Sequence, residues 1–148
     1  MNQPRACWSV LLNKAQEEVA RVQGELAALR ERRQSLGASR ERLLSLREDY
    51  IRAPQKGAVS AGMMETLNRR QFADQLLVLV DRVDRDIAQV EQGLARARAR
   101  LLSAERERLK MQSLQAHDEK QVRDDRAQRE RRQLDDLGTL RHVHGARP

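Results

Sequence analysis

Aromatic residues are scarce in this sequence. Only 2% of the 148 residues are aromatic, and they are Trp8, Tyr50 and Phe72. A globular core in a chain of this length normally uses more aromatic bulk. The chain is rich in Ala, Leu, Glu, Arg and Gln instead, which is typical of long helices. We therefore expect an all-α protein that folds as a single coiled-coil domain over residues 1–148.

Cysteines and long apolar runs are also nearly missing. The one cysteine, Cys7, excludes an internal disulfide and fits a reducing compartment. No apolar run approaches the roughly 20 residues that a membrane-spanning helix needs. The short semi-apolar run near the N-terminus is followed at once by Lys14 and Glu17, which does not fit a signal peptide. These absences predict a soluble, cytoplasmic protein.

Motifs for catalysis, cofactors and metals are absent as well. There is no glycine-rich phosphate loop, which argues against the usual kind of nucleotide site. His142 and His144 offer two ligands near the C-terminus, whereas a metal site needs three or four. Carboxylates are plentiful, but a helix pair offers no pocket to desolvate them. We predict that the protein is not an enzyme and has no catalytic residues, metal, cofactor or small-molecule substrate.

A concentrated basic surface is missing, although the formal net charge is +7. A surface that follows a phosphate backbone needs cations gathered on one face. Here both signs alternate along the chain at i, i+3 and i, i+4 spacings, which is typical of solvated helix faces. We therefore expect no nucleic acid among the partners. A basic coiled-coil nucleic-acid binder stays open as an alternative of another class.

A heptad pattern of apolar residues, sustained from Phe72 to Met111, is the main feature that is present. Most residues between the apolar positions are charged or carry amides. Such a stripe is typical of a coiled coil and needs a second helix to cover it. One lane of the pattern is Ala73, Val80, Ile87, Leu94 and Leu101, and the other is Leu76, Val83, Val90, Ala97, Ala104 and Met111.

A matching pattern precedes it, in a helix predicted over about residues 8–52. The continuous apolar lane of this helix is Trp8, Ala15, Val22, Leu29, Leu36, Leu43 and Tyr50. The companion lane begins with Leu12, Val19 and Leu26 and then turns to Arg33, Arg40 and Arg47. Arginine can lay its apolar stem along a seam and keep its charged end in water. Charged seam positions cost stability but help to fix register.

A single corner, about residues 53–62, separates the two patterns. Pro54 disfavours helix before it, and the segment PQKGAVSAG contains two glycines and a serine. The second helix is predicted over about residues 64–137. A short corner between two long helices favours an antiparallel hairpin. The predicted fold is therefore a long two-helix antiparallel coiled-coil hairpin.

The two apolar patterns also match each other in length. If Tyr50 lies near Phe72, the numbers of facing residues add to about 122, and Trp8 faces the neighbourhood of Leu114. The apolar lanes of the second helix end in the same place, just after Met111. The agreement of these two observations supports the hairpin.

The chain beyond this point forms a predicted C-terminal helical overhang. Its sequence HDEKQVRDDRAQRERRQ, residues 117–133, contains almost nothing apolar and neither glycine nor proline. It is either a single helix supported by i, i+4 ion pairs or frayed chain, and its high helix propensity favours the helix. Gly138 is a candidate helix stop, so residues 138–148 are predicted to be a loose tail.

Three apolar groups are candidates for contacts with partners. The first surrounds the corner and either binds a partner or merely closes the hairpin end; it comprises Leu43, Leu46, Tyr50, Phe72, Leu76 and Leu79. The second lies where the rod begins and comprises Trp8, Leu11 and Leu12. The third lies in the overhang, which the hairpin cannot cover, and comprises Leu134, Leu137 and Leu140. Exposed apolar clusters on charged elements suggest a partner.

The chain resembles the FliJ family of the bacterial flagellar type III export apparatus over nearly its full length. The joint placement of Tyr50, the corner and Gln71-Phe72 carries much of the resemblance. The segments that match are REDYIR around Tyr50, SAG in the corner, RQFADQL around Phe72, ERERLKMQSLQ further along and RQLDDLGTLRH near the end. The sequence departs from the family pattern at Leu46, where an aromatic residue is common, and at Val83, where a polar residue can occur.

The resemblance implies a non-enzymatic stalk, similar in fold to the central coiled coil of rotary ATPases. It implies that the end carrying both termini contacts the hexameric export ATPase. The corner end would then reach the large membrane subunit of the export gate, with the family's gate-facing patch falling on Leu43, Tyr50, Phe72 and Leu76. Export chaperones are further implied partners. The implied location is cytoplasmic and peripheral at the inner membrane.

Two other functions remain open from the sequence, besides the nucleic-acid binder. One is the equivalent stalk protein of a virulence type III injectisome, which the residues do not separate from a flagellar protein. The other is a homo-oligomeric scaffold, in which the long helix pairs with its own copies.

Overall fold

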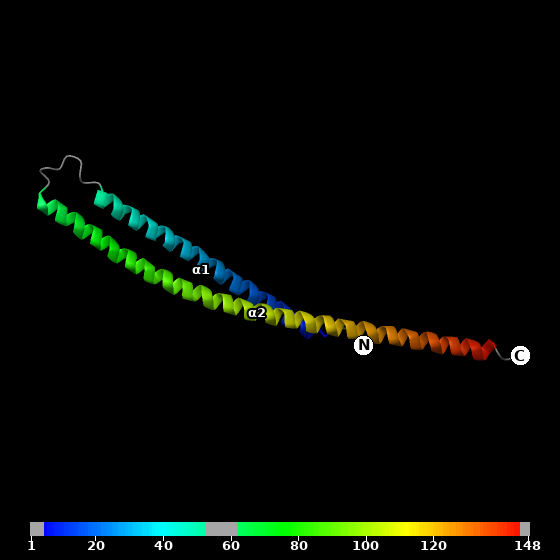
Figure 1. The fold of residues 1–148 in the computed structure, drawn as a ribbon. Coiled ribbons are helices and arrows are strands. Elements are labelled where there is room, and N and C mark those ends of the chain that lie inside the picture. The colour runs from blue at the N-terminus through cyan, green and yellow to red at the C-terminus, as the bar shows by residue number, and fades with distance from the viewer. Residues whose placement is uncertain (1–4, 53–61, 146–148) are drawn as a thin grey trace. The chain divides into compact units, whose positions relative to one another are not determined.

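The computed structural model describes residues 5–52 and 62–145. These residues form two α-helices, α1 (Ala6–Arg52) and α2 (Met63–Gly145), and contain no strand (Figure 1). The two helices pack against each other as an antiparallel hairpin, so the predicted fold class is confirmed. Except for Gly62, the predicted corner lies outside the described residues.

Both helices begin slightly before their predicted starts. The Trp8 N–H donates to the Arg5 carbonyl at 3.2 Å, so the first turn of α1 precedes the aromatic residue. At the start of α2 the Glu65 N–H donates to the Gly62 carbonyl at 3.0 Å, which places Gly62 at the helix cap. Glycine is an accepted cap residue, although it supplies no side-chain acceptor.

The predicted end of the second helix, near residue 137, is wrong. α2 continues through Gly138 to Gly145, so residues 138–145 are helix and not a loose tail. A glycine ends a helix when its backbone turns left-handed, and Gly138 does not have a positive φ. Thr139 also bonds back to the Asp135 carbonyl at 2.8 Å, as a hydroxyl within a helix does. Residues 146–148 lie outside the described part.

The contacts divide the chain into two compact units, each with part of both helices. Unit 1 comprises Met1–Arg21 and Leu102–Pro148, and unit 2 comprises Val22–Leu101. The single-domain organisation inferred from the sequence stays a prediction.

The apolar core of unit 2 follows the heptad lanes. Val22 and Ala97 are completely buried. One buried cluster consists of Leu26, Val90, Leu94 and Ala97, and the partly buried side chains that pack against it are Leu29, Leu36 and Leu101. The buried side chains of this unit are Val22, Leu26, Ala73, Leu76, Val80, Ile87, Val90, Leu94 and Ala97. All of them belong to the predicted lanes, so the sequence pattern identified the core correctly.

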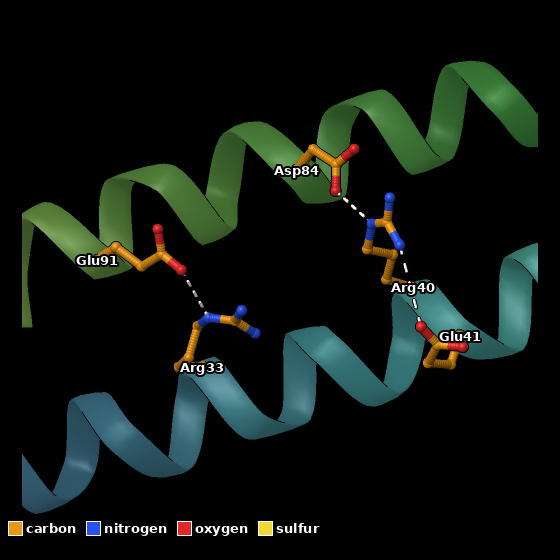
Figure 2. A network of polar contacts seen from close by, with 5 residues as sticks. All are labelled: Arg33, Arg40, Glu41, Asp84 and Glu91. Carbon is orange, nitrogen blue, oxygen red and sulfur yellow. Dashed lines mark hydrogen bonds and ion pairs between the residues drawn. The ribbon is translucent and has the colours of Figure 1, made fainter.

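Polar contacts between the helices fix the register of unit 2. Arg33 Nε lies 3.1 Å from Glu91 Oε1, and Arg40 Nε lies 2.6 Å from Asp84 Oδ1 (Figure 2). Arg100 pairs with Glu25 at 2.9 Å. The residue numbers of these pairs add to 124 or 125, close to the predicted 122. The antiparallel register inferred from the sequence is therefore confirmed within this unit.

The core of unit 1 is shorter. Ala15 and Val19 of α1 and Ala104 of α2 are buried there. The Arg5 N–H donates to Asp118 Oδ2 at 2.8 Å, so the residue before α1 lies beside α2 within unit 1. Beyond Val122 every described residue of α2 is exposed, so residues 123–145 form the helical overhang that the composition predicted.

Candidate interaction surfaces

An aromatic pair lies at the corner end of unit 2. The rings of Tyr50 from α1 and Phe72 from α2 have centroids 4.4 Å apart and are tilted by 37°. This distance lies at the lower limit of the range for favourable aromatic contacts, about 4.5–7 Å. It joins the last full turn of α1 to the early part of α2, as the alignment of the two helices predicted.

A shallow groove of about 600 Å³ runs beside the aromatic pair. We call it the tip groove, and it is lined by Leu46, Asp49, Tyr50, Glu65, Asn68, Arg69 and Phe72. Apolar and aromatic side chains form part of the lining, and charged side chains of both signs complete it. Such a mixture is suited to a protein partner, because anchors need apolar contact while a polar rim provides specificity.

The six predicted gate-contact residues are distributed unevenly around this groove. Leu46, Tyr50 and Phe72 line it together. Leu79 is 43% exposed on α2, and Leu43 is half-buried on α1, but neither lines the groove. The groove therefore brings together half of the predicted set.

Leu76, the sixth member, has its side chain in the helix interface and is only 3% exposed. Its position in a heptad lane was the signal for this burial. A partner that approaches unit 2 from solvent does not reach this buried side chain.

Other exposed apolar residues of unit 2 near the corner were not selected from the sequence. Met63 and Met64 at the start of α2 are 82% and 76% exposed, and Ile51 and Leu67 are about half exposed. These residues lie outside the heptad lanes, and consecutive apolar residues off the lanes are the signal that was available. Flexible methionine side chains adapt readily to a binding partner.

In unit 1 the predicted group at the start of α1 is partly covered. Trp8 and Leu12 are half-buried, and Leu11 is 38% exposed. Trp8 and Leu12 belong to the lanes, whereas Leu11 lies beside them. The group therefore combines helix packing with a limited accessible apolar surface.

The predicted overhang group is fully accessible. Leu134, Leu137 and Leu140 are each more than half exposed, and Val143 continues the series at 51%. Residues spaced by three lie about 60° apart around a helix, so these side chains wind around the overhang instead of forming one straight stripe. Arg5, which is close to Trp8 in the sequence, contacts Asp118. Leu134 is sixteen residues beyond Asp118, or about 24 Å along the helix axis, so the overhang group is separate from Trp8.

Charged residues on the helix surfaces pair with neighbours of opposite sign. Arg21 contacts Glu18 at 2.6 Å, and Arg85 contacts Asp81 at 3.0 Å.

Among the described residues, no group of three or more His, Cys, Asp or Glu side chains is placed to hold a metal ion. Within the described residues, neither α1 nor α2 contains a stretch with the length and hydropathy of a membrane span.

Comparison with known proteins places the chain beside a family of flagellar proteins. The family model described as "Flagellar FliJ protein" matches residues 9–147, which span both helices and both units. Neither the curated proteins nor the solved structures contain a significant match to this chain.

Proposed function

Because the chain belongs to the FliJ family of flagellar proteins, which implies a role related to flagellar protein export, we propose that it is a non-enzymatic stalk of the export apparatus. In this role it links the hexameric export ATPase to the large membrane subunit of the export gate. It also assists the delivery of chaperones and their cargo. Its place is the cytoplasmic face of the inner membrane. The match to a flagellar family favours this system over a virulence injectisome.

Two separate apolar surfaces support the proposal most. The tip groove gathers Leu46, Tyr50 and Phe72 in unit 2, and the overhang exposes Leu134, Leu137 and Leu140 in unit 1. A monomeric protein rarely keeps contiguous apolar groups accessible unless they bind something. We assign the gate to the tip groove and the ATPase ring to the overhang, with Trp8, Leu11 and Leu12 as the second part of the ring contact.

The gate contact is tested by the double substitution Leu46→Ala and Phe72→Ala. It removes two apolar anchors from the tip groove, and anchors of this kind typically contribute about 2 kcal/mol or more each to binding. We expect cells with this variant to lose swimming motility in soft agar, while the helix content measured by circular dichroism stays unchanged.

The matched control is Val78→Ala, which shortens a neighbouring side chain of α2 that is 67% exposed and does not line the groove. This control should swim normally. Normal swimming of the double variant would refute the gate assignment.

The ATPase contact is tested by replacing Leu134, Leu137 and Leu140 together with serine. All three side chains are more than half exposed, so the fold should tolerate the change. We expect the variant to lose co-purification with the export ATPase. A variant with Leu102→Ser and Leu109→Ser, which changes other exposed leucines of α2, is the control and should retain binding. Unchanged binding of the triple variant would move the contact to Trp8, Leu11 and Leu12.

A further inference from the structure

Half-buried arginines of α1 pair with carboxylates of α2 at regular spacing in unit 2. Arg33 pairs with Glu91, and Arg40, seven residues later, pairs with Asp84, seven residues earlier on the antiparallel helix (Figure 2). The side chains of Arg33 and Arg40 are 39% and 38% exposed, so each lies against the seam with its guanidinium directed to a carboxylate at the edge. The heptad repeat brings successive pairs to the same side of the helix interface.

The next step of this series has an arginine but no carboxylate. Seven residues beyond Arg40 is Arg47, whereas seven residues before Asp84 is Leu77, and a further seven is Arg70. Arg47 is half-buried like its predecessors, and its Nε is buried without a hydrogen-bond partner. Arg47 is therefore half-buried as Arg33 and Arg40 are, but its Nε lacks the carboxylate acceptor that theirs have.

A second open space, of about 470 Å³, surrounds this arginine. We call it the arginine groove, and it is lined by Arg47, Tyr50, Ile51, Thr66, Arg69, Arg70, Ala73 and Asp74. Arg69 contributes a second buried nitrogen, Nη1, that has no hydrogen-bond partner. Buried donors without acceptors are unfavourable, because folding removes their water without replacing it.

The charges around the groove do not satisfy these donors. Among the lining residues that the structure describes, Asp74 is the single carboxylate. It is exposed, and the described contacts include no ion pair between it and Arg47, Arg69 or Arg70. Three arginines against one aspartate leave the groove with a net positive charge. Tyr50 and Ile51, which are 40% and 51% exposed, add an apolar contact surface beside it.

The arginine groove is not the tip groove. The two share Tyr50 and Arg69, but every other lining residue differs. On α1 the tip groove uses Leu46 and Asp49, whereas the arginine groove uses Arg47 and Ile51, which lie on the other flank of the lane through Tyr50. The tip groove also has two carboxylates, so the two flanks differ in charge.

We propose that the arginine groove binds a carboxylate side chain from a partner protein, presented by a short segment in which Asp or Glu is adjacent to an apolar residue. The carboxylate accepts a hydrogen bond from Arg47 Nε, as Asp84 and Glu91 do from Arg40 and Arg33, and the apolar neighbour packs on Tyr50 and Ile51. A protein carboxylate fits better than a nucleic-acid backbone, because Asp74 interrupts the cations and the groove provides a local cluster instead of an extended basic track.

The missing carboxylate can be supplied from within the chain by Leu77→Glu. This substitution places a carboxylate where the series of Glu91 and Asp84 would continue, opposite Arg47. Leu77→Gln is the control, because it has nearly the same shape but no charge. We expect the melting temperature of Leu77→Glu to be roughly 2–4 °C higher than that of Leu77→Gln. This difference should vanish when both variants also carry Arg47→Gln. Equal melting temperatures of Leu77→Glu and Leu77→Gln would show that a carboxylate opposite Arg47 does not stabilise the protein.

Binding is tested on the full chain with a short peptide of alternating leucine and glutamate, blocked at both termini. In spectra of the ¹⁵N-labelled protein, the amides around Arg47, Ile51 and residues 69–74 should shift. A peptide with glutamine in place of glutamate should bind roughly ten- to a hundredfold more weakly. Arg47→Gln should weaken the binding of the acidic peptide by a similar factor. The Leu77→Glu variant should also bind this peptide more weakly than the Leu77→Gln variant, by a similar factor.

Three results would overturn the proposal. One is equal binding of the acidic and the neutral peptide, and another is a set of shifts located elsewhere in the chain. The third is tighter binding of duplex DNA or of vesicles with acidic phospholipids at the same residues, which would assign the groove to phosphate. The peptide experiment uses the purified chain, so its outcome is independent of the contact with the export gate.

Discussion

Two glycines of α1 lie in the interior of the helix but have different surroundings. A Cβ added at Gly24 would meet nothing within 4 Å, whereas one at Gly37 would lie 3.1 Å from Arg33 Nη1. Glycine in a helix interior is about 1 kcal/mol less favourable than alanine. The two positions therefore separate helix propensity from side-chain crowding.

We expect Gly24→Ala to raise the free energy of unfolding by about 0.5–1 kcal/mol, as measured by urea denaturation. Gly37→Ala should gain less, because the new methyl group displaces the Arg33 guanidinium from Glu91. In a background with Arg33→Ala, the two glycine substitutions should raise the free energy of unfolding by similar amounts. A larger gain at Gly37 than at Gly24 in the natural background would contradict this explanation.

The arginines of the α1 lane act on register more than on stability. An exposed ion pair contributes only about 0–1 kcal/mol. A slip of one heptad in either direction, however, brings two arginines together, Arg33 with Arg98 in one case and Arg47 with Arg70 in the other. Apolar lanes alone would tolerate such slips, because they repeat every seven residues. The charged positions therefore select one alignment among several that bury similar apolar surface.

The overhang of α2 has no packing partner in unit 1, since residues 123–145 are all exposed. A helix without tertiary contacts depends on its propensity and on local side-chain pairs, which contribute only tenths of a kcal/mol each. It is continuous with the packed part of α2, so it does not need its own nucleus.

We therefore expect backbone amides in residues 123–145 to exchange with solvent at least roughly a hundredfold faster than those around Ile87 and Val90. Hydrogen exchange followed by mass spectrometry measures this directly. Binding of the export ATPase should slow the exchange around Leu134–Leu140. Strong protection of the free overhang would mean that it is covered, for example by a second copy of the chain.

The helices were predictable from the sequence to the extent that heptad periodicity defines them. The lanes identified the buried residues correctly, and the pairing of Tyr50 with Phe72 gave the register. The end of α2 was not predictable. Gly138 is a residue type that often ends helices, but its backbone does not adopt the left-handed conformation that would end this one. A glycine permits a left-handed turn but does not require it.

The candidate sites were less accessible to sequence reasoning than the core. The tip groove was partly predicted, because Leu46 and Phe72 lie off the heptad lanes that account for the buried core. The arginine groove was not predicted, since Arg47 looked equivalent to Arg33 and Arg40. The three arginines differ in what faces them on α2. Arg33 faces Glu91 and Arg40 faces Asp84, whereas the same register places Leu77, which has no carboxylate, opposite Arg47.

At the scale of the whole molecule, the formal net charge of +7 is distributed over two units rather than gathered on one surface. Arginines pair with acidic residues within each unit, as Arg21 does with Glu18 in unit 1 and Arg100 with Glu25 in unit 2. The excess positive charge is thereby dispersed along the helices. Such dispersion favours solubility and leaves specific recognition to local groups of side chains.

The scarcity of aromatic residues also makes the molecule convenient to observe. The single tryptophan, Trp8, belongs to unit 1, and the single tyrosine, Tyr50, belongs to unit 2. Each unit therefore carries one intrinsic fluorophore of its own kind. Tryptophan emission excited at the red edge of its absorption follows unit 1, while the tyrosine signal follows unit 2. The unfolding of each unit, and the arrival of a partner at either one, can thus be recorded in the natural chain without any label.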